Sequence, residues 1–363
     1  MTNLPIRKDL IGRSPYGAPQ IDVPVRLNTN ENPFGPSPEL VSELAKVVSE
    51  IGSDLNRYPD RDATDLRADL ATYLNSESQV NLTAKNIWPA NGSNEVMQQL
   101  LQLFGGPDKG LVAFDPTYSM YEDYCRNTFT SYLSVSRNED FTIDKKVIDK
   151  ALALNPDIVV VTSPNNPTGT VIDVSDIDYL LENFSGVLIV DEAYAEFRPA
   201  GSPSALSRLN TNPRLIVVRT MSKAFSYAGA RVGYAAANPE VVDALQLVRL
   251  PYHLSTVTQA VARVALRFSD QLQSQVALLR QERDDLAIWL VNQGFEVAPS
   301  GANFLLFGTF GDRNQVWEQL VKQGVLIRQT GPAGWLRVSI GTPQENLAFK
   351  TALLDVTNQT NGK

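Results

Sequence analysis

Short apolar segments alternate with longer amphipathic ones between residues 87 and 237. The apolar segments are rich in Val and Ile at consecutive positions, so both faces of each are expected to be buried. Strands of this kind lie between two helical layers, and the pattern therefore predicts an α/β fold with a mostly parallel sheet. The predicted strands are GLVAF (110–114), DIVVVT (157–162), GVLIVD (186–191), RLIVVRT (214–220) and RVGYAAA (231–237).

The pattern differs on either side of this region. The first 37 residues are rich in Pro, Gly and Asn and predict an extended arm. A long helical pattern covers about residues 254–294, and the segments after it alternate between strand and helix, which predicts a smaller α+β domain. We therefore predict an N-terminal arm over 1–37, a large domain over 38–260 and a small C-terminal domain over 261–363.

The net charge and the apolar content of the chain argue against a nucleic-acid-binding protein and a membrane protein. The chain of 363 residues has 43% apolar residues and a net charge of −8, so a broad basic surface for nucleic acid is not expected. No apolar segment approaches the roughly 18 residues that a membrane span needs, and the first residues do not resemble a signal peptide. We expect a cytoplasmic protein without a membrane partner.

A single cysteine, Cys125, and a single histidine, His253, exclude several kinds of chemistry. The chain can form no internal disulfide and no Cys/His zinc cluster, and we expect no metal site. A catalytic triad would depend on His253 alone, and no nucleophile motif accompanies it. If the chain is an enzyme, its Lys, Tyr, Asp and Arg residues or a cofactor must carry the reaction.

Polar residues follow the predicted strands at the points where the strands end. SPNNPTG follows 157–162, Asp191 ends 186–191, and TMSK follows 214–219. NGSN follows another short apolar run, which ends at Ala90, and opens a helix. Ligands of open α/β sheets bind beyond the carboxyl ends of the strands, so these residues are candidates for one site.

Lys223 has an unusual setting among these residues. No acidic residue lies between Glu196 and Glu240, whereas Arg219 and Arg231 flank the lysine. Nearby cations disfavour the charged form of an amine, which lowers its pKa and favours a nucleophile able to form a Schiff base with a carbonyl. The alternative is an ordinary lysine in a solvated loop.

The other strand ends also allow two interpretations each. Asp191 either caps the following helix or meets a cationic group on a ligand, because a buried carboxylate needs a partner. NGSN either binds an anion such as phosphate at the helix N-terminus or simply begins the helix. One ligand with an aldehyde, a phosphate and a basic ring nitrogen would use all of these places, and pyridoxal phosphate (PLP) is such a ligand.

Several motifs resemble those of a known family. SPNNPTG, DEAY and TMSKAFSYAGARVGY closely resemble the signatures of the fold type I PLP-dependent aminotransferases. LNTNENPFGPSP, RYPD, ANGSNE, PTYSMY and GWLRVSIG resemble the histidinol-phosphate aminotransferase subgroup, and SPYGAPQIDVPVRLNTNENP and VRLPYHLSTVTQA are similar to its actinobacterial members. Phe34 stands where this motif commonly has tyrosine. The resemblance implies a seven-stranded, mostly parallel sheet flanked by helices in the large domain.

The resemblance also implies a role for each residue of a cofactor site. Lys223 is expected to bond the cofactor aldehyde and later to move a proton, and Asp191 to keep the ring nitrogen protonated. Tyr118 is expected to stack on the ring. Hydrogen bonds to the ring hydroxyl are expected from Asn166 and Tyr194. The phosphate is expected to contact Ser93, Asn94, Thr220, Ser222 and Arg231, and Tyr58 from the neighbouring subunit of a homodimer.

Two arginines in the tail are expected to bind the substrates. The resemblance implies that Arg337 binds the α-carboxylate of the amino-acid partner and that Arg328 helps to bind the anionic end of the substrate. Arginine suits carboxylate and phosphate alike because its guanidinium group binds both in a bidentate manner. Other substrate contacts are expected from Tyr16, Asn32, Tyr252 and Asn303.

The expected reaction moves the amino group of L-histidinol phosphate to 2-oxoglutarate, giving imidazole-acetol phosphate and L-glutamate in histidine biosynthesis. One alternative is an aromatic amino-acid aminotransferase. Another is a PLP-dependent decarboxylase of a phosphorylated amino acid. A third, of a different class, is a PLP-free binding or regulatory protein in which Lys223 is structural.

Overall fold

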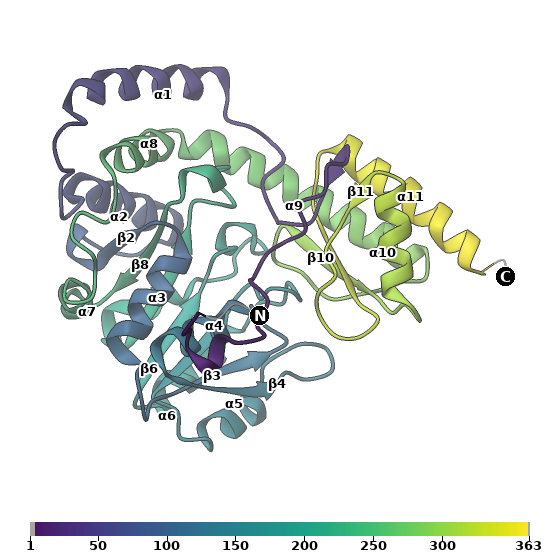
Figure 1. Ribbon diagram of the computed structural model, residues 1–363, viewed down its shortest axis with the longest axis horizontal. Coiled ribbons are helices and arrows are strands. Elements are labelled where there is room, and N and C mark those ends of the chain that lie inside the picture. The colour runs from purple at the N-terminus through teal and green to yellow at the C-terminus, as the bar shows by residue number, and fades with distance from the viewer. Residues whose placement is uncertain (1–3, 362–363) are drawn as a thin grey trace.

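The computed structural model describes residues 4–361 and contains one large mixed sheet (Figure 1). The sheet has seven strands in the order β2-β8-β7-β6-β5-β3-β4. This confirms the α/β fold and the mostly parallel sheet that the sequence predicts. The strands are β2 (Ile87–Ala90), β3 (Gly110–Asp115), β4 (Ser131–Ser136), β5 (Ile158–Thr162), β6 (Val187–Asp191), β7 (Leu215–Thr220) and β8 (Gly233–Ala237).

Two strands differ from the pattern read in the sequence. Strand β8 runs antiparallel to both of its neighbours, β2 and β7, whereas the other neighbouring pairs are parallel. Strand β4 was not among the predicted strands, because it lies at the sheet edge and its polar serines alternate with half-buried apolar residues. The central strands β5, β7 and β8 are buried along their whole length, as their consecutive apolar residues predict.

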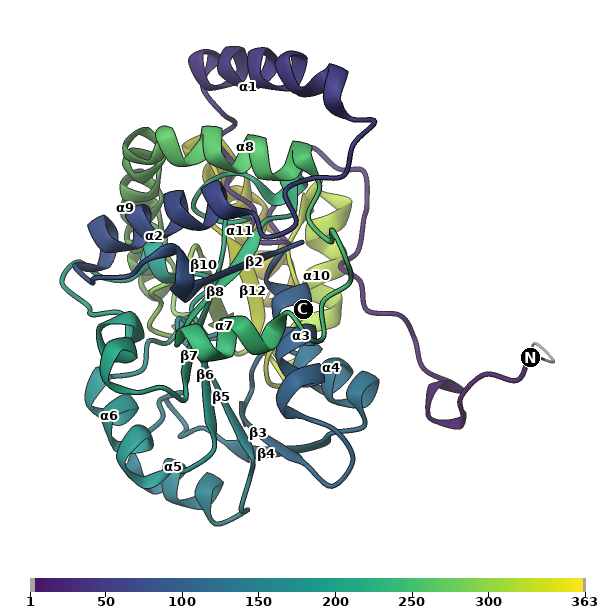
Figure 2. The same ribbon diagram turned by 90° about the vertical axis from the view of Figure 1, so that its left-hand side faces the viewer.

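Helices cover both faces of this sheet (Figure 2). On one face, α3, α4 and α7 bury apolar side chains against the strands, and on the other α2, α5 and α6 do so. Helix α1 packs farther out, against α8. These helices are α1 (Pro38–Ile51), α2 (Thr64–Ser78), α3 (Ser93–Phe104), α4 (Met120–Thr128), α5 (Lys145–Leu152), α6 (Val174–Asn183) and α7 (Pro239–Leu245).

A second, smaller group of strands and helices follows in the last quarter of the chain. Strands β9 (Glu296–Val297), β10 (Phe304–Gly308) and β12 (Leu336–Ser339) form an antiparallel sheet. The N-terminal arm joins this region, because β1 (Val25–Arg26) pairs in parallel with β11 (Val325–Leu326). Helices α10 (Arg313–Lys322) and α11 (Pro343–Asn361) pack against each other.

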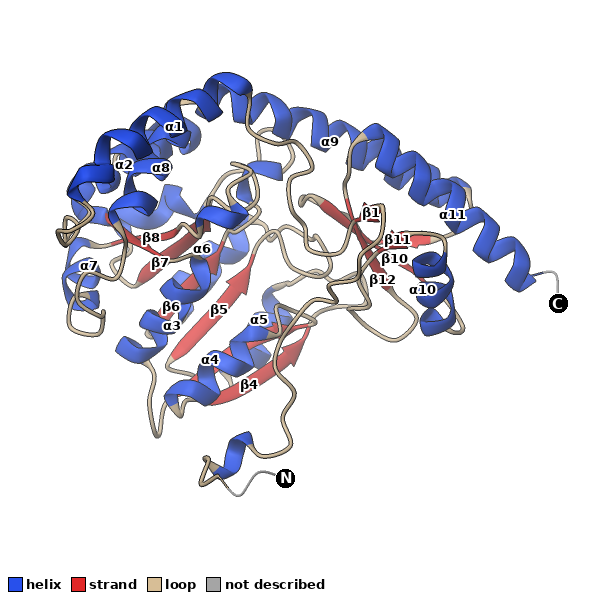
Figure 3. Cartoon of the chain, turned by 45° about the horizontal axis from the view of Figure 1, so that its top comes forward, coloured by secondary structure: helices blue, strands red, loops and turns tan. Residues whose placement is uncertain are grey.

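The long helical pattern of residues 254–294 consists of two helices, α8 (Thr256–Arg267) and α9 (Ser269–Asn292), which meet at Phe268. Together they span from the large sheet to the small one (Figure 3). Helix α8 packs on α1 and α2, and α9 contacts β9 and β10. The domain boundary at residue 260 stays a prediction. Among residues 4–361, no helix has the length and apolar character needed to cross a bilayer.

Candidate active site

A cavity of about 470 Å³ lies at the carboxyl ends of β5, β6 and β7. Besides the loops after these strands, its wall includes the segment after β3, the start of α3, the arm and three residues of the small sheet region. Predicted site residues from all of these segments therefore share one space. Those lining it are Tyr16, Ser93, Asn94, Tyr118, Asn166, Asp191, Tyr194, Thr220, Ser222, Lys223, Arg231, Arg328 and Arg337.

Lys223 projects into this cavity from the loop after β7. Its amine donates a hydrogen bond of 2.9 Å to the backbone oxygen of Thr29 in the arm, and no described carboxylate forms an ion pair with it. Burial, and after it the charge of Arg337, lowers the pKa of Lys223 from 10.5 to about 8, although Glu31 opposes the shift. About a tenth of the amine is therefore uncharged, and thus nucleophilic, at pH 7, and about half of it at pH 8.

Asp191 ends β6 on the other side of the cavity and is 5% exposed. Its carboxylate accepts 2.7 Å from the hydroxyl of Tyr121 and 3.1 Å from the backbone N–H of Ala193. Burial raises the pKa of Asp191, and the Tyr121 hydroxyl opposes this by stabilising the carboxylate. No described cation forms an ion pair with this carboxylate, so its charge is available to a cationic group on a ligand.

The N-terminus of α3 faces the same cavity because two glycines allow a close approach. Gly233 of β8 lies so near that a Cβ there would be 2.1 Å from the backbone nitrogen of Ser93. Gly92 has a φ of +84°, and a Cβ there would lie 2.5 Å from Arg231 Nη2. The free N–H groups of the helix and a guanidinium group therefore lie side by side, which is a suitable arrangement for an anion.

Two hydroxyl groups complete this end of the cavity. The Thr220 hydroxyl lies 2.9 Å from the Ser222 hydroxyl and accepts 3.1 Å from the Ser222 backbone N–H. Both residues are largely buried, at 3% and 7% exposure. Hydroxyl groups, helix N–H groups and an arginine together form a donor set that suits phosphate.

The middle of the cavity contains two polar groups that are oriented by other residues. The Tyr194 hydroxyl accepts 3.0 Å from the side-chain amide of Asn30, so its own proton remains free to be donated. Asn166 accepts 2.5 Å from Arg337 Nη1 through its amide oxygen, which leaves its amide nitrogen as a donor. The ring of Tyr118 stands perpendicular to that of Tyr121, with the ring centroids 5.7 Å apart.

Two arginines face the cavity without a carboxylate partner among residues 4–361. Arg337 is 6% exposed and donates to Asn166 and, at 2.8 Å, to the backbone oxygen of Asn28. Burial lowers the pKa of Arg337 to about 10. The Nε of Arg337 and the Nη1 of Arg328 are buried and have no hydrogen-bond partner. Because an unpaired buried donor is costly, these two nitrogens indicate the place of an anionic ligand.

Four predicted site residues do not line this cavity. Asn303 is fully buried, and its side-chain amide donates 3.0 Å to the backbone oxygen of Asn30. Asn32 donates 3.4 Å to the backbone oxygen of Ala224. Tyr58 and Tyr252 stack on each other with centroids 4.4 Å apart and are 80% and 40% exposed. Within one chain, Asn303 and Asn32 therefore lie outside the cavity wall, and their expected substrate contacts, like that of Tyr252, stay predictions.

The interpretation of Arg219 as a cation that lowers the pKa of Lys223 is wrong, because Arg219 is not among the groups that shift this pKa. Its side chain is 0% exposed and pairs with Glu77, Glu192 and Glu196, away from the cavity. The reason is the alternation along β7, which places residue 219 on the face opposite Thr220. Tyr121 and Asn30, which orient Asp191 and Tyr194, were not recognised in the sequence, because only the folded chain shows these partners.

Comparison with known proteins agrees with this geometry. The family "Aminotransferase class I and II" matches residues 22–352. The histidinol-phosphate aminotransferase of Thermobifida fusca is 55% identical over 98% of this chain and 96% of its own length. The histidinol-phosphate aminotransferase 3 of Burkholderia lata is 53% identical, with the same coverage.

Among solved structures, histidinol-phosphate aminotransferase from Sinorhizobium meliloti in complex with pyridoxal-5′-phosphate superposes with a TM-score of 0.83. The superposition covers 93% of this chain and 92% of that one, at 23% sequence identity, and bears on the fold alone. The family match and the identity to close relatives extend over nearly all of the chain. The chain therefore belongs to the class I and II aminotransferases and, within them, to the histidinol-phosphate aminotransferases.

Proposed function

We infer that the chain transfers the amino group of L-histidinol phosphate to 2-oxoglutarate, with pyridoxal 5′-phosphate as its cofactor. The observation that carries this inference is the position of Lys223. Its amine has a lowered pKa and lies in one cavity with Asp191, which has no cationic partner, and with two arginines, which have no carboxylate partner. The relatives named for this reaction support the choice of substrate.

The residue types that line the cavity match the chemical groups of PLP. Asp191 offers a buried carboxylate to a protonated ring nitrogen, and Asn166 and Tyr194 each keep a donor for the ring hydroxyl. The α3 N-terminus, Arg231 and the hydroxyls of Thr220 and Ser222 offer donors to a phosphate. Bound PLP supplies an aldehyde that condenses with amines and a ring that accepts the electron pair released at the substrate Cα.

Lys223 has two tasks in this proposal. Its amine bonds the cofactor in the resting protein, for which the uncharged form is required. With the cofactor and substrate bound, Lys223 Nζ would take the proton from the substrate Cα as a base and then donate it as an acid. Desolvation and the nearby charge of Arg337 keep the pKa of this amine close to the working pH, which is the range in which a base can also act as an acid.

Asp191, Tyr121 and Tyr194 prepare the site before the substrate arrives. The hydrogen bond from the Tyr121 hydroxyl favours the charged form of Asp191 against the effect of burial, and that carboxylate would stabilise a protonated ring nitrogen. Asn30 fixes the direction in which the Tyr194 hydroxyl donates its proton. Dipoles and charges that are oriented in advance need no rearrangement during the reaction.

Arg337 and Arg328 fit both substrates of a transaminase. In the first half-reaction they meet a phosphate ester, and in the second the carboxylates of 2-oxoglutarate, and a guanidinium group binds both kinds of anion. The partnerless Nε of Arg337 and Nη1 of Arg328 are the donors that we assign to this task. Tyr16 lines the opening from the arm, with its ring perpendicular to that of Tyr118.

We further propose a homodimer in which Tyr58 reaches the neighbouring site. In one chain Tyr58 is 80% exposed and stacks only on Tyr252, which leaves an aromatic pair outside the cavity. Exposed Leu55, Leu247 and Leu250 add apolar surface close to this pair in sequence, and such surface is typical of an interface. The cytoplasmic location stays a prediction.

Steady-state rates with two amino donors test the substrate. We expect a higher kcat/KM for L-histidinol phosphate than for L-phenylalanine, because only the former carries a dianion for the arginines. A preference for phenylalanine of about tenfold or more, equal to about 1.4 kcal/mol of transition-state binding, would contradict the proposal and favour an aromatic aminotransferase. Release of carbon dioxide from a phosphorylated amino acid would instead indicate a decarboxylase.

A further inference from the structure

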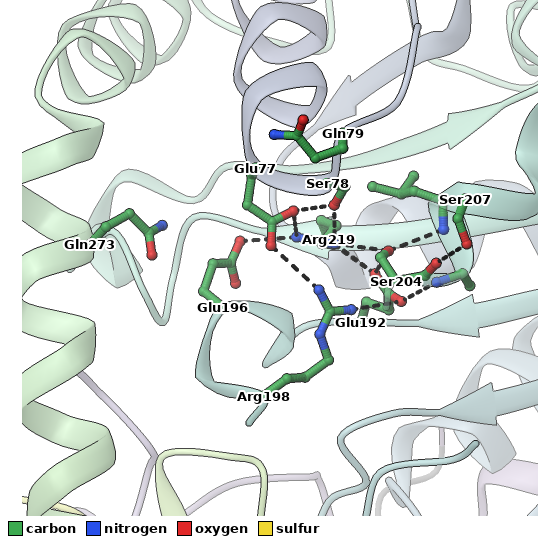
Figure 4. Close-up of polar contacts among 12 residues, drawn as sticks. Glu77, Ser78, Gln79, Glu192, Glu196, Arg198, Ser204, Ser207, Arg219 and Gln273 are labelled. Atoms are coloured by element: carbon green, nitrogen blue, oxygen red, sulfur yellow. Dashed lines mark hydrogen bonds and ion pairs between the residues drawn. The ribbon is translucent and has the colours of Figure 1, made fainter. Parts of the chain in front are cut away.

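A buried network of charged side chains surrounds Arg219 and Glu192 (Figure 4), and neither residue lines the cavity. Its centre is Arg219 of β7, whose side chain is 0% exposed. Side chains alternate along a strand, so Arg219 shares a face with Val217, whereas Thr220 shares the cavity face with Val218. The network therefore touches the same strand as the cofactor site without touching the cavity.

Every nitrogen of the Arg219 guanidinium has an acceptor (Figure 4). The Nε donates 2.9 Å to Glu192, the Nη1 lies 3.3 Å from both Glu77 and Glu196, and the Nη2 donates 3.1 Å to the Ser204 hydroxyl. Five donors in a rigid fork, all with partners, fix both the position and the rotation of this side chain.

Glu192 is held just as completely. One carboxylate oxygen accepts from Arg219 and, at 2.7 Å, from the Ser204 hydroxyl. The other accepts 2.9 Å from the backbone N–H of Ala205 and 3.2 Å from Arg198. The backbone N–H of Glu192 also donates 2.8 Å to the oxygen of Val218 in β7. The Arg219–Glu192 pair thus joins the carboxyl end of β7 to that of β6.

The two members of this pair adjoin residues of the cofactor site. Glu192 directly follows Asp191, and Arg219 directly precedes Thr220, with Lys223 only three residues farther on. One ligand must meet Asp191 at its ring nitrogen and Lys223 at its aldehyde at the same time. A shift of one strand end against the other would separate these two groups, and a misplacement of about 1 Å can slow a reaction by about a hundredfold.

Stabilisation of the fold alone is a weak reason for such a network. Buried ion pairs lose much of their mutual attraction to the cost of removing charges from water, and apolar residues of similar volume often stabilise a protein as well or better. Hydrogen bonds are directional, so a fully hydrogen-bonded pair fixes the position of one strand end relative to the other. Apolar packing does not fix this position in the same way.

We propose that Arg219 and Glu192 are positioning residues, which set the spacing between Asp191 and Lys223 and thereby the affinity and the protonation of the bound cofactor. This proposal rests on the proposed function, since it concerns the same site. Neither residue touches the ligand, and Ser204 assists by bridging the pair. Glu77, Glu196 and Arg198 surround the pair and hold it in place.

The test compares Arg219→Lys, Glu192→Gln and Ser204→Ala with the wild type as full-length proteins. Three quantities are measured: the PLP dissociation constant of the apo-protein, the pH midpoint of the visible band of the bound cofactor, and the thermal unfolding midpoint of the apo-protein. We expect a dissociation constant raised by about tenfold or more in the two charged-residue variants and a displaced pH midpoint, because the cofactor no longer meets both groups in their original geometry. We expect Ser204→Ala to change the PLP dissociation constant and the pH midpoint in the same direction, but by a smaller amount than the other two variants.

Arg283→Lys is the matched control. Arg283 is also a buried arginine, at 4% exposure, and donates 2.8 Å to the Phe197 oxygen, but it lies on α9 and does not line the cavity. We expect it to lower the unfolding midpoint and to leave both cofactor measurements unchanged. If Arg219→Lys and Glu192→Gln do not fold, Ser204→Ala decides the question by the same two measurements.

Variants that fold and bind PLP with the affinity and the pH midpoint of the wild type would overturn the positioning role and leave the proposed function intact. A wild-type protein that takes up no PLP would overturn the proposed function itself, and the positioning role with it. The two failures are therefore distinguishable.

Discussion

At the scale of single residues, the chemistry depends on two buried groups whose pKa values are shifted in opposite directions. Burial lowers the pKa of the Lys223 amine to about 8 and raises the pKa of the Asp191 carboxyl, and the Tyr121 hydroxyl opposes the second shift by hydrogen-bonding to the carboxylate. Burial acts on both in the same physical way, since it disfavours the charged form of each. The two groups differ in their hydrogen-bond partners, which are Tyr121 and Ala193 for Asp191 and the backbone oxygen of Thr29 for Lys223.

The pH dependence of PLP uptake tests the lysine. The uncharged amine is the form that reacts with an aldehyde, so we expect the rate of uptake by the apo-protein to rise with pH around a midpoint near 8. Between about pH 8 and pH 10.5 the folded state binds fewer protons than the unfolded state. Burial of the charged amine therefore lowers the free energy of unfolding by its full amount below pH 8, and this loss is relieved as the pH rises through that window. Stopped-flow absorbance measures the rate, and a midpoint near 10.5 would contradict the lowered pKa.

Tyr121→Phe tests whether the Tyr121 hydroxyl stabilises the charged form of Asp191. The change removes one hydroxyl and keeps the ring, so Asp191 loses its 2.7 Å donor and its pKa rises further. We expect PLP affinity to fall by about tenfold or more, since a hydrogen bond to a charged group contributes about 1.5–3 kcal/mol, and we expect the acid limb of the pH–rate profile to move to higher pH. Tyr132→Phe, which removes a hydroxyl that donates 3.1 Å to the Asp115 carboxylate outside the cavity, serves as the control. Equal effects of the two variants would contradict the role of Tyr121.

The sequence predicted the principal residues of the site but not their supports. Lys223, Asp191 and Arg231 stand at strand ends or in motifs, where their positions in the chain identify them. Tyr121 and Asn30 lie within the motifs PTYSMY and LNTNENPFGPSP, but they act through contacts between distant segments, which the sequence does not show. Arg219 is near Lys223 in sequence and yet lies on the other face of the sheet, which alternation along a strand explains.

At the scale of the elements, the site depends on the close packing of α3 on β8. The pairs β2–β8 and β7–β8 are antiparallel, and the apolar pattern alone does not specify strand direction. The same pattern overlooked β4 at the sheet edge and did not show the break at Phe268. Strands buried on both faces were predicted well, because consecutive Val and Ile residues leave little ambiguity.

Gly233→Ala tests this packing. A Cβ at residue 233 would lie 2.1 Å from the Ser93 nitrogen, and the backbone on both sides has little room to move. We expect the N-terminus of α3 to be displaced, PLP affinity to fall and the protein to lose about 1–3 kcal/mol of unfolding free energy, as in other overpacked sites. Gly52→Ala has open space around the new methyl group and is the control. Titration with PLP and thermal unfolding give both readouts, and a Gly233→Ala protein that behaves like Gly52→Ala would contradict the account.

At the scale of the whole molecule, one chain contains the cavity but leaves Tyr58 outside it. In a symmetric dimer the same patch of each subunit faces its partner, so Tyr58 of each chain can complete the other site. The arm and the small sheet already bring distant segments together within one chain, as Asn28, Thr29, Arg328 and Arg337 show by lining the cavity with the strand ends. In the proposed dimer, Tyr58 would add a segment of the second chain to this wall.

Mixing two inactive variants tests this arrangement. Lys223→Ala lacks the reactive amine, and Tyr58→Ala lacks the side chain that we expect to be contributed to the partner. After joint refolding, half of the dimers contain one of each chain, and one of their two sites is intact, so roughly a quarter of the wild-type activity is expected. Activity no higher than the sum of the separate variants would contradict a shared site.

The central claim is that Lys223 holds PLP and that L-histidinol phosphate transfers its amino group to it. The most direct measurement adds L-histidinol phosphate alone to the PLP-loaded protein and follows the visible absorbance band. We predict that the band disappears, that one equivalent of imidazole-acetol phosphate forms per site, and that 2-oxoglutarate restores the band with release of glutamate. A band that remains unchanged, or its full presence in Lys223→Ala, would contradict the account.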